Sequence, residues 1–157
     1  MVIRSAGMAD TVSIAATHRA SIEGLCSGAY SAQDIGGWIG IIAPDIYENA
    51  IKDKVMIVAE DEGEIIGLGI LDLKQKEIAA MYIHPKVKGT GVGSRLLLDL
   101  EARASKENVE RLTLCSTINA HGFYLLHGYI GEDKTFHELP DGVRLECIRM
   151  YKLLSTG

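Results

Sequence analysis

The sequence predicts a mixed-sheet α/β fold formed by a single domain over residues 1–157. Segments rich in β-branched residues alternate with segments of helical periodicity, and three strand patterns follow one another in the middle of the chain without a helix between them. Of the 157 residues, 47% are hydrophobic and 24% are charged, which is typical of a globular domain. This composition excludes an intrinsically disordered chain and a disulfide-rich miniprotein.

The first third of the chain has the pattern of one strand followed by two helices. Residues 2–5 form a short candidate strand, and Asp10 can cap a helix whose apolar positions continue at helical spacing to Leu25. A second helix is expected from near Ser31, because an acidic side chain falls in its first turn and apolar residues share one side. Pro44 stops this helix or starts the next turn.

The middle of the chain carries the three consecutive strand patterns. Val55–Glu60 and Ile65–Leu73 flank the turn sequence Asp61–Glu64, and together they predict an antiparallel hairpin. Glu77–Ile83 supplies the next strand, which ends at Pro85 because proline has no amide hydrogen to give to a neighbouring strand. A hairpin followed by a third strand is consistent with a mixed sheet.

The rest of the chain alternates between helices and strands. A strongly amphipathic helix runs to about Lys106, with leucines and alanines on its buried stripe. The later elements expected are a strand at Leu112–Cys115, a helix at Asn119–His127 ending at Gly128, an extended segment from Tyr129 and a last strand at Val143–Leu153. No internal repeat or linker interrupts this order.

The stretch Lys88–Ser94, called the glycine loop below, lies between a strand and the amphipathic helix. Its glycines let the backbone approach a ligand closely, and the first amides of the following helix have no intrahelical acceptors. Lys86, Lys88 and Arg95 add positive charge to this region. The loop therefore has the donors needed to bind the oxygens of a phosphate group.

Two familiar nucleotide motifs fail to match the glycine loop. The Walker loop requires a lysine at a position where this sequence has none. The dinucleotide fingerprint GxGxxG fails because Ser94 replaces its last glycine and because residues 84–89 separate the strand from the core of the loop. A plain glycine turn at the start of an ordinary helix is a further alternative.

Two segments resemble a known family. Glu77–Pro85, followed by Lys88–Leu97, resembles the central acetyl-coenzyme A motif of the GNAT N-acetyltransferases, written [RQ]xxGxG[AG], with Lys88 where arginine or glutamine is customary. Asn119–Tyr129 is similar to the later NAxxFYxxxGF element of that family, with tyrosine in place of the final phenylalanine. Two motifs in the right order are more specific than either alone, and with the N-terminal region the resemblance covers nearly the whole chain.

The resemblance implies an acetyl-coenzyme A-dependent N-acetyltransferase with a mostly antiparallel central sheet and helices on both faces. The diphosphate of the coenzyme would rest on amides of the glycine loop, and its pantetheine arm would follow a strand opened by a bulge or by divergence. The acetyl group would pass directly to an amine in a ternary complex. The implied coenzyme-binding residues are Met81, Ile83, Lys88, Gly89, Thr90, Gly91, Val92, Gly93, Ser94 and Asn119.

Two side chains are implied as catalytic, and each also has a structural explanation. Tyr124 matches the family tyrosine that gives a proton or hydrogen bond to the departing thiolate, or else its ring packs in the core. Glu77 matches a residue that some members of the family use as the general base. The alternative is that Glu77 is a solvated carboxylate at a strand end, and that a water chain removes the proton of the amine. Asn119 contacts the pantetheine arm or only caps its helix.

No metal site is expected. The histidines lack the spacing of a ligand set, and the three cysteines form no CxxC pair, as expected of reduced thiols in the cytoplasm. We expect Cys115 to be a core residue rather than a nucleophile, because it lies in an apolar strand. The residues considered as ligands are His84, His121 and His127.

The net charge limits the range of partners. With 16 basic and 21 acidic residues the chain carries a charge of −5, which opposes broad binding to nucleic acid or to an anionic membrane. No apolar run approaches the roughly 20 residues that span a bilayer, and no signal-peptide pattern is present, so we expect a cytoplasmic protein. The oligomeric state stays open between a monomer and a homodimer.

The sequence leaves the acceptor of the acetyl group open. A protein N-terminus, a lysine, a polyamine, an aminoglycoside and a small metabolite are all compatible with it. Selectivity is expected to come from Tyr30–Trp38 and from Phe136–Arg144, although core packing is the expected role of Trp38 itself. A non-catalytic acyl-coenzyme A-binding or regulatory module is the alternative to an enzyme.

Overall fold

A computed structural model describes residues 1–155 and has a seven-stranded sheet at its centre. The strand order is β1-β2-β3-β4-β5-β7-β6, and β4 with β5 is the one parallel pair among the described residues. The strands are β1 (Val2–Ser5), β2 (Val55–Asp61), β3 (Glu64–Asp72), β4 (Glu77–Ile83), β5 (Arg111–Thr117), β6 (Ile130–Glu138) and β7 (Arg144–Leu153). The predicted mixed sheet, mostly antiparallel, is confirmed.

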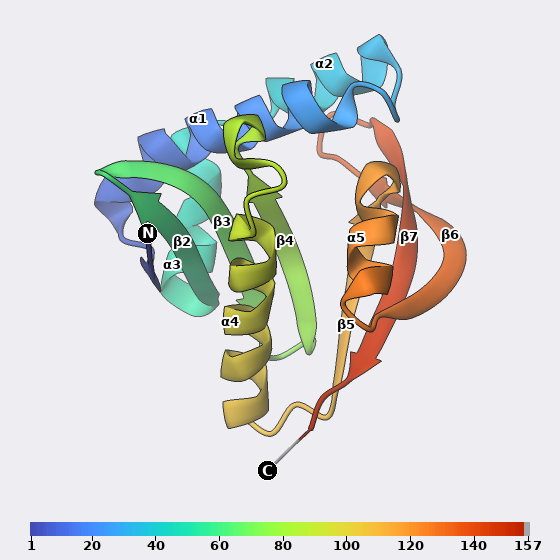
Figure 1. The fold of residues 1–157 in the computed structure, drawn as a ribbon. Coiled ribbons are helices and arrows are strands. Elements are labelled where there is room, and N and C mark those ends of the chain that lie inside the picture. Colours follow the sequence, from blue (N-terminus) through green and yellow to red (C-terminus); the bar gives the residue numbers. More distant parts are fainter. Residues whose placement is uncertain (156–157) are drawn as a thin grey trace.

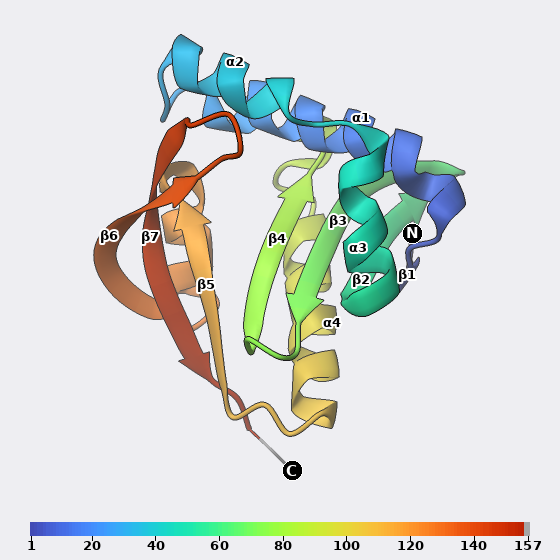
Figure 2. The same ribbon diagram turned by 180° about the vertical axis from the view of Figure 1, so that it is seen from behind.

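Helices cover both faces of this sheet, as predicted (Figures 1 and 2). Residues of α1 (Thr11–Ser21), α2 (Ala32–Gly40) and α3 (Glu48–Asp53) share one apolar core with β2 and β3. The other face packs against α4 (Val92–Lys106), with α5 (His121–Leu126) beside it. Short 3₁₀ turns occur at Met8–Asp10, Pro44–Tyr47, Pro85–Val87 and Ile118–Ala120. No helix in the described part of the chain has the length and apolar content to cross a membrane.

The predicted order of elements is confirmed, with two differences on the α1 side. The first helix does not stay α-helical to Leu25, because Ile22–Cys26 forms a π-helix at its end. The segment from Pro44 was predicted only as a stop or a turn, but it contains a 3₁₀ turn and then α3. This helix has six residues, too few for its periodicity to be recognised in the sequence.

Asp10 occupies the capping position of α1 but does not cap it with its side chain. Its carboxylate accepts hydrogen bonds from the Arg4 guanidinium at 2.8 and 2.9 Å and from the Gly7 amide at 2.7 Å. The hydrogen bond from Arg4 is the main reason why the pKa of Asp10 lies below its usual value. The capping prediction is therefore wrong for this side chain, which joins β1 to the turn before α1.

The position of the functional site is set by the separation of β4 from β5. These strands pair only at Glu77↔Thr113 and Ile78↔Leu114. Ala79 is an extra residue, because Ile78 pairs with Leu71 and Ala80 pairs with Ile70 on the neighbouring strand β3. Beyond this bulge the two strands diverge toward α1 and α2 (Figure 2), which leaves backbone groups on their facing edges without a ladder partner.

Two glycines of β3 allow α4 to pack closely on the sheet. A Cβ atom at Gly67 would lie 2.7 Å from Leu96 Cδ1, and one at Gly69 would lie 2.9 Å from Leu100 Cδ1. Leu96 and Leu100 are fully buried. The glycine loop precedes α4 directly, so this packing also fixes the loop against the sheet.

We expect Gly69→Ala to destabilise the protein by about 1–3 kcal/mol, because the added methyl group overpacks the contact with Leu100. Urea unfolding followed by circular dichroism measures this change. The matched control is Gly36→Ala within α2, where a Cβ meets nothing within 4 Å. Alanine there should stabilise the helix by about 0.5–1 kcal/mol. Equal stabilities for the two variants would contradict the packing argument.

Candidate active site

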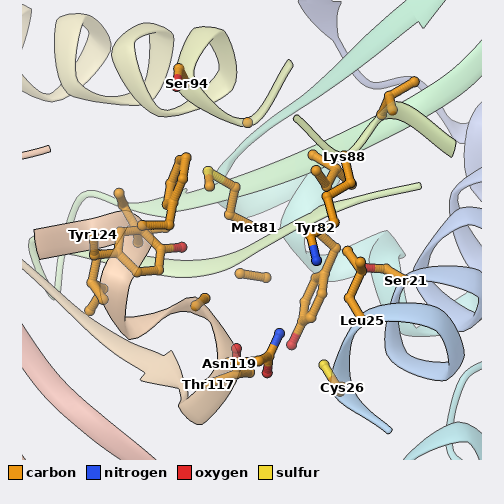
Figure 3. A pocket seen from close by; sticks show the side chains of 18 of the residues that line it. Ser21, Leu25, Cys26, Met81, Tyr82, Lys88, Ser94, Thr117, Asn119 and Tyr124 are labelled. Atoms are coloured by element: carbon orange, nitrogen blue, oxygen red, sulfur yellow. The ribbon is translucent and has the colours of Figure 1, made fainter. Parts of the chain in front are cut away.

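A cavity of about 600 Å³ lies where β4 and β5 diverge, and we call it the β4–β5 cavity. Its walls come from the end of α1 and the π-helix, from β4, from the glycine loop, and from β5 with the segment that continues into α5. Figure 3 shows Tyr124 on one side of it, and Tyr82, Leu25 and Cys26 on the other. The cavity therefore joins the glycine loop to side chains from both halves of the sheet.

The backbone of the glycine loop forms one wall of this cavity. Gly89 and Gly91 have φ angles of +77° and +91°, a conformation that only glycine adopts readily, and a Cβ on either would point into open space. Gly91 is the residue before the first turn of α4, whose amides have no acceptor within the helix. Five residues of the loop line the cavity: Lys88, Gly89, Gly91, Gly93 and Ser94. An empty cradle with amide donors suits an anionic group such as a diphosphate.

Two of the loop residues named from the sequence do not reach the cavity. The amide and hydroxyl of Thr90 both donate to the carbonyl of Val87, at 3.2 and 2.5 Å. Val92 is buried in the core under α4. Of the three cations near the loop, Lys86 forms an ion pair with Glu64, and Lys88 is the one that lines the cavity.

Ser94 also links the glycine loop to α5. In the neutral ring, His127 donates from Nδ1 to the carbonyl of Phe123 at 2.8 Å. Its Nε2 atom therefore accepts the hydrogen bond from the Ser94 hydroxyl, at 2.9 Å. This pair holds the start of α4 beside the helix that carries Tyr124.

Strand β4 contributes Met81 and Ile83 to the cavity, as the sequence predicted, and also Tyr82. The Tyr82 ring packs on His18 with ring centroids 4.2 Å apart, and its hydroxyl points toward Asn119 (Figure 3). Sequence reasoning missed Tyr82 because alternation places it on the other face of β4 from Met81 and Ile83, whereas the cavity lies at the open edge of the strand and is lined by residues of both faces.

Tyr124 is buried, with 6% of its surface exposed, and it lines the cavity from α5. Burial raises the pKa of its phenol, so the hydroxyl keeps its proton at neutral pH. No residue within 1–155 forms a hydrogen bond with this hydroxyl. Figure 3 shows it directed toward the interior of the cavity, where it can donate to a ligand. The alternative of a core tyrosine describes its ring but leaves this hydroxyl without a partner.

Glu77 and Asn119 differ in their relation to the cavity. Glu77 lies at the paired start of β4, one residue before the lining begins at Ile78. Asn119 does line the cavity, from the 3₁₀ turn before α5. Its side chain contacts the Cys26 thiol and makes no capping hydrogen bond, so the alternative that it only caps its helix is wrong.

The wall formed by α1 and the π-helix was not recognised in the sequence. Ser21, Leu25 and Cys26 line the cavity from this side. A Cβ at Gly24 would lie 2.4 Å from Pro85 Cγ, so glycine is needed for the π-helix to pack against the end of β4. Gly24 was therefore the one signal of this wall in the sequence, but a single glycine near a helix end does not identify the contact that requires it.

Several side chains noted in the sequence take other positions. Cys115 is exposed and lines the cavity, so the prediction of a core residue is wrong. Trp38 is 5% exposed, which confirms core packing. Tyr30 links β7 to the 3₁₀ turn after β5, because its hydroxyl donates to the Glu146 carbonyl at 2.5 Å and accepts from the Ile118 amide at 3.1 Å. No cluster of three or more potential metal-binding side chains occurs between residues 1 and 155.

Comparison with known sequences gives a consistent result. The family model of the acetyltransferase (GNAT) domain matches residues 26–150. The amino-acid acetyltransferase of Ralstonia nicotianae is 30% identical over 125 residues, covering 71% of this chain and 27% of that protein. The enzyme of the same name from Pseudomonas putida is 28% identical over 109 residues, covering 59% and 25%. The chain thus spans about a quarter of the length of these curated relatives.

Known structures share the fold over almost their whole length. A GCN5-related N-acetyltransferase (aminotransferase, class II) from Rhodopseudomonas palustris matches with a TM-score of 0.90 and 25% identity, covering 98% of this chain and 95% of that one. The PaiA N-acetyltransferase of Thermoplasma acidophilum, solved with coenzyme A, matches with a TM-score of 0.79 and 24% identity, covering 97% and 98%. With the family model matched from the π-helix to β7, this chain belongs to the GNAT acetyltransferase family.

Proposed function

We propose that the protein transfers the acetyl group of acetyl-coenzyme A to a primary amine, by direct attack of the amine in a ternary complex. The observation that carries this proposal is the β4–β5 cavity, which connects the glycine loop to the Tyr124 hydroxyl. An activated thioester supplies the acetyl group, and the residues described here would bind and orient it. The names of the curated relatives, amino-acid acetyltransferases, support an amine acceptor.

The glycine loop would hold the diphosphate of the coenzyme. Gly89, Gly91, Gly93 and Ser94 line the cavity, so their amides would be the donors, and the Lys88 ammonium would add a charge of the right sign. The diverging edge of β4 at Met81 and Ile83 would pair with the amide-containing pantetheine arm, as a sheet edge pairs with an added strand. Thr90 and Val92 would act only by shaping the loop.

Tyr124 would donate a hydrogen bond to the sulfur atom that leaves. Full proton transfer is unfavourable, because burial raises the phenol pKa above its usual value near 10 while an ordinary thiol has a pKa near 8.5. A hydrogen bond from a preorganised donor still stabilises the negative charge that develops on sulfur. Asn119, across the cavity from Tyr124, would contact the pantetheine arm.

The amine must lose a proton before or during transfer, and two routes are open. Glu77 could act as general base only through a bridging water, because it lies outside the cavity lining. The second route needs no base from the protein, because the amine enters the cavity already neutral.

Transfer of radiolabelled acetyl from acetyl-coenzyme A to a panel of amines tests the proposal, alongside calorimetry of coenzyme A binding. We expect micromolar or tighter coenzyme binding and an acetylated amine identified by mass spectrometry. Coenzyme binding with no transfer to any amine would instead identify a non-catalytic coenzyme-binding module. Absence of coenzyme binding would contradict the assignment of the cavity.

We expect the protein to be located in the cytoplasm and to be either a monomer or a homodimer. The three cysteines are free thiols in the described part of the chain, which supports a reducing compartment such as the cytoplasm. A homodimer is compatible with the fold, and size-exclusion chromatography with light scattering decides between it and a monomer.

A further inference from the structure

The β4–β5 cavity carries one charged side chain among the residues that the structure describes, Lys88, and this charge is positive. We assign Lys88 to the diphosphate of the coenzyme, so an ammonium ion that enters beside the bound coenzyme would meet no carboxylate of the protein. The polar groups available to an acceptor are uncharged hydroxyls, thiols and an amide. They belong to Ser21, Cys26, Tyr82, Cys115, Thr117 and Asn119.

The titratable groups that face the cavity come from every element around it. Lys88 belongs to the glycine loop and Cys115 to β5. Burial raises the pKa of Cys26, on the π-helix, to about 11, and it also raises the pKa values of Tyr82 on β4 and Tyr124 on α5. Cys26, Tyr82 and Tyr124 are therefore uncharged at neutral pH.

The side chain behind Tyr82 is also uncharged. His18 stacks on the Tyr82 ring and donates or accepts one hydrogen bond, between Nδ1 and the Tyr47 hydroxyl at 2.8 Å. Its Nε2 atom is buried and has no partner within residues 1–155. Burial lowers the pKa of His18 to about 4, so the ring is neutral at physiological pH. The wall on this side thus provides neither a counter-charge nor a strong base.

Burying an ammonium against uncharged walls is unfavourable, so the neutral amine is the form that this cavity accepts. The neutral fraction then depends on the pKa of the acceptor itself. At pH 7.5 an α-amino group with a pKa near 7.8 is about 30% neutral, whereas a lysine-type amine with a pKa near 10.4 is about 0.1% neutral. The difference amounts to about 250-fold in the concentration of the reactive form.

We propose that the acceptor is an α-amino group or another primary amine with a pKa near 8, and that it enters the β4–β5 cavity in its neutral form. This inference rests on the proposed acetyltransferase function. Lysine side chains and polyamines, whose amines are almost wholly charged at neutral pH, are poor acceptors. The α-amine can belong to a small molecule or to the end of a peptide chain, which present the same chemistry to the cavity.

The pH dependence of kcat/KM for several acceptors tests this proposal. The series is alaninamide, a short peptide with a free N-terminus, Nα-acetyl-lysinamide and spermidine, with the small molecule and the peptide distinguishing the two sources of an α-amine. We expect kcat/KM to rise tenfold per pH unit up to the pKa of each acceptor, and to be about 250-fold higher for the α-amines at pH 7.5. Preference for spermidine or the lysine derivative would overturn the inference.

Two variants separate the acceptor's own titration from that of a protein base. Glu77→Gln removes the carboxylate next to the cavity lining, and Cys115→Ser removes the thiol of β5 within it. We expect the inflection in kcat/KM to follow the acceptor pKa in both variants, as in the unmodified protein. An inflection at the same pH for every acceptor, lost in either variant, would show that the protein supplies the base and would contradict the inference.

Calorimetry provides a readout that does not depend on turnover. Acceptor binding to the protein loaded with coenzyme A is measured at pH 7.5 in two buffers of different ionisation enthalpy. A lysine-type amine that binds in its neutral form releases close to one proton, and an α-amine releases about 0.7. Binding without proton release would show that the ammonium is bound, which excludes the proposed mode of recognition.

A designed carboxylate tests the charge argument directly. Leu25 is half-buried in the cavity wall, so Leu25→Glu adds a negative charge there and Leu25→Gln is the matched uncharged control. We expect the glutamate variant to raise kcat/KM for spermidine at least about tenfold relative to the glutamine variant. Equal values would count against the inference. If coenzyme A binds but no amine is acetylated by any form, the proposed function itself fails; if spermidine is the best acceptor, only this inference fails.

Discussion

Gly91→Val is expected to weaken coenzyme A binding at least about 100-fold, equivalent to about 2.8 kcal/mol. Gly91 precedes α4 with a φ angle of +91°, which a β-branched residue adopts only at a cost of about 1–3 kcal/mol. Its Cβ would point into open space at the glycine loop, the place that we assign to the diphosphate. The valine therefore either occupies that place or distorts the loop. Isothermal titration calorimetry with coenzyme A measures the loss.

Gly63→Val is the matched control for this variant. Gly63 lies in the β2–β3 turn with a φ angle of +79°, and a Cβ there also meets nothing within 4 Å. The backbone strain is thus similar, but the turn is not part of the cavity lining. We expect comparable losses of stability in the two variants and normal coenzyme affinity in Gly63→Val. Normal affinity in Gly91→Val would mean that the loop does not bind the diphosphate.

Tyr124→Phe is expected to lower kcat about 100-fold while changing coenzyme affinity less than threefold. The substitution removes only the hydroxyl, which faces the cavity and has no hydrogen-bond partner within residues 1–155. Because no internal hydrogen bond is lost, the free energy of unfolding should stay within about 0.5 kcal/mol of the original value. Steady-state kinetics with the best amine, together with urea unfolding, gives both quantities.

Tyr129→Phe distinguishes a catalytic hydroxyl from a structural one. The Tyr129 hydroxyl donates to buried Glu101 at 2.8 Å, and Glu101 also pairs with Lys152 at 3.1 Å. Removing this hydroxyl should cost about 1–3 kcal/mol of stability and leave kcat unchanged. The opposite pattern, with full turnover in Tyr124→Phe, would exclude Tyr124 as the donor to the leaving thiolate.

The sequence predicted the strands and helices correctly where an element is long or has a clear end signal. β4 begins and ends at the predicted residues because Pro85 stops it, and α4 ends at the predicted Lys106 because its apolar stripe is continuous. The π-helix and α3 were not predicted. A π-helix and a six-residue helix are decided by packing against the sheet, since neither is long enough to be set by local periodicity.

The part of the candidate site that the backbone of the glycine loop forms could be predicted from the sequence. The side chains that line the rest of the cavity could not. Positive φ angles at Gly89 and Gly91 require glycine, so the glycine loop could be found in the sequence. Tyr82 and Cys115 became part of the cavity because β4 diverges from β5, which opens the facing edges of both strands. Which face a strand residue occupies depends on register, and register is a property of the whole sheet.

The sequence by itself determined the family, the order of elements and the loop fitted for a diphosphate, because these depend on local backbone preference and on residues adjacent in the chain. Only the tertiary structure decided that Lys88 is the one charged side chain in the cavity lining among the described residues, and that Glu77 lies outside this lining. Those features arise where the π-helix, β4, β5 and α5 meet, from residues about 100 positions apart. Charge in a cavity is the sum over all its walls, and the pKa of each group there depends on burial that no single segment specifies.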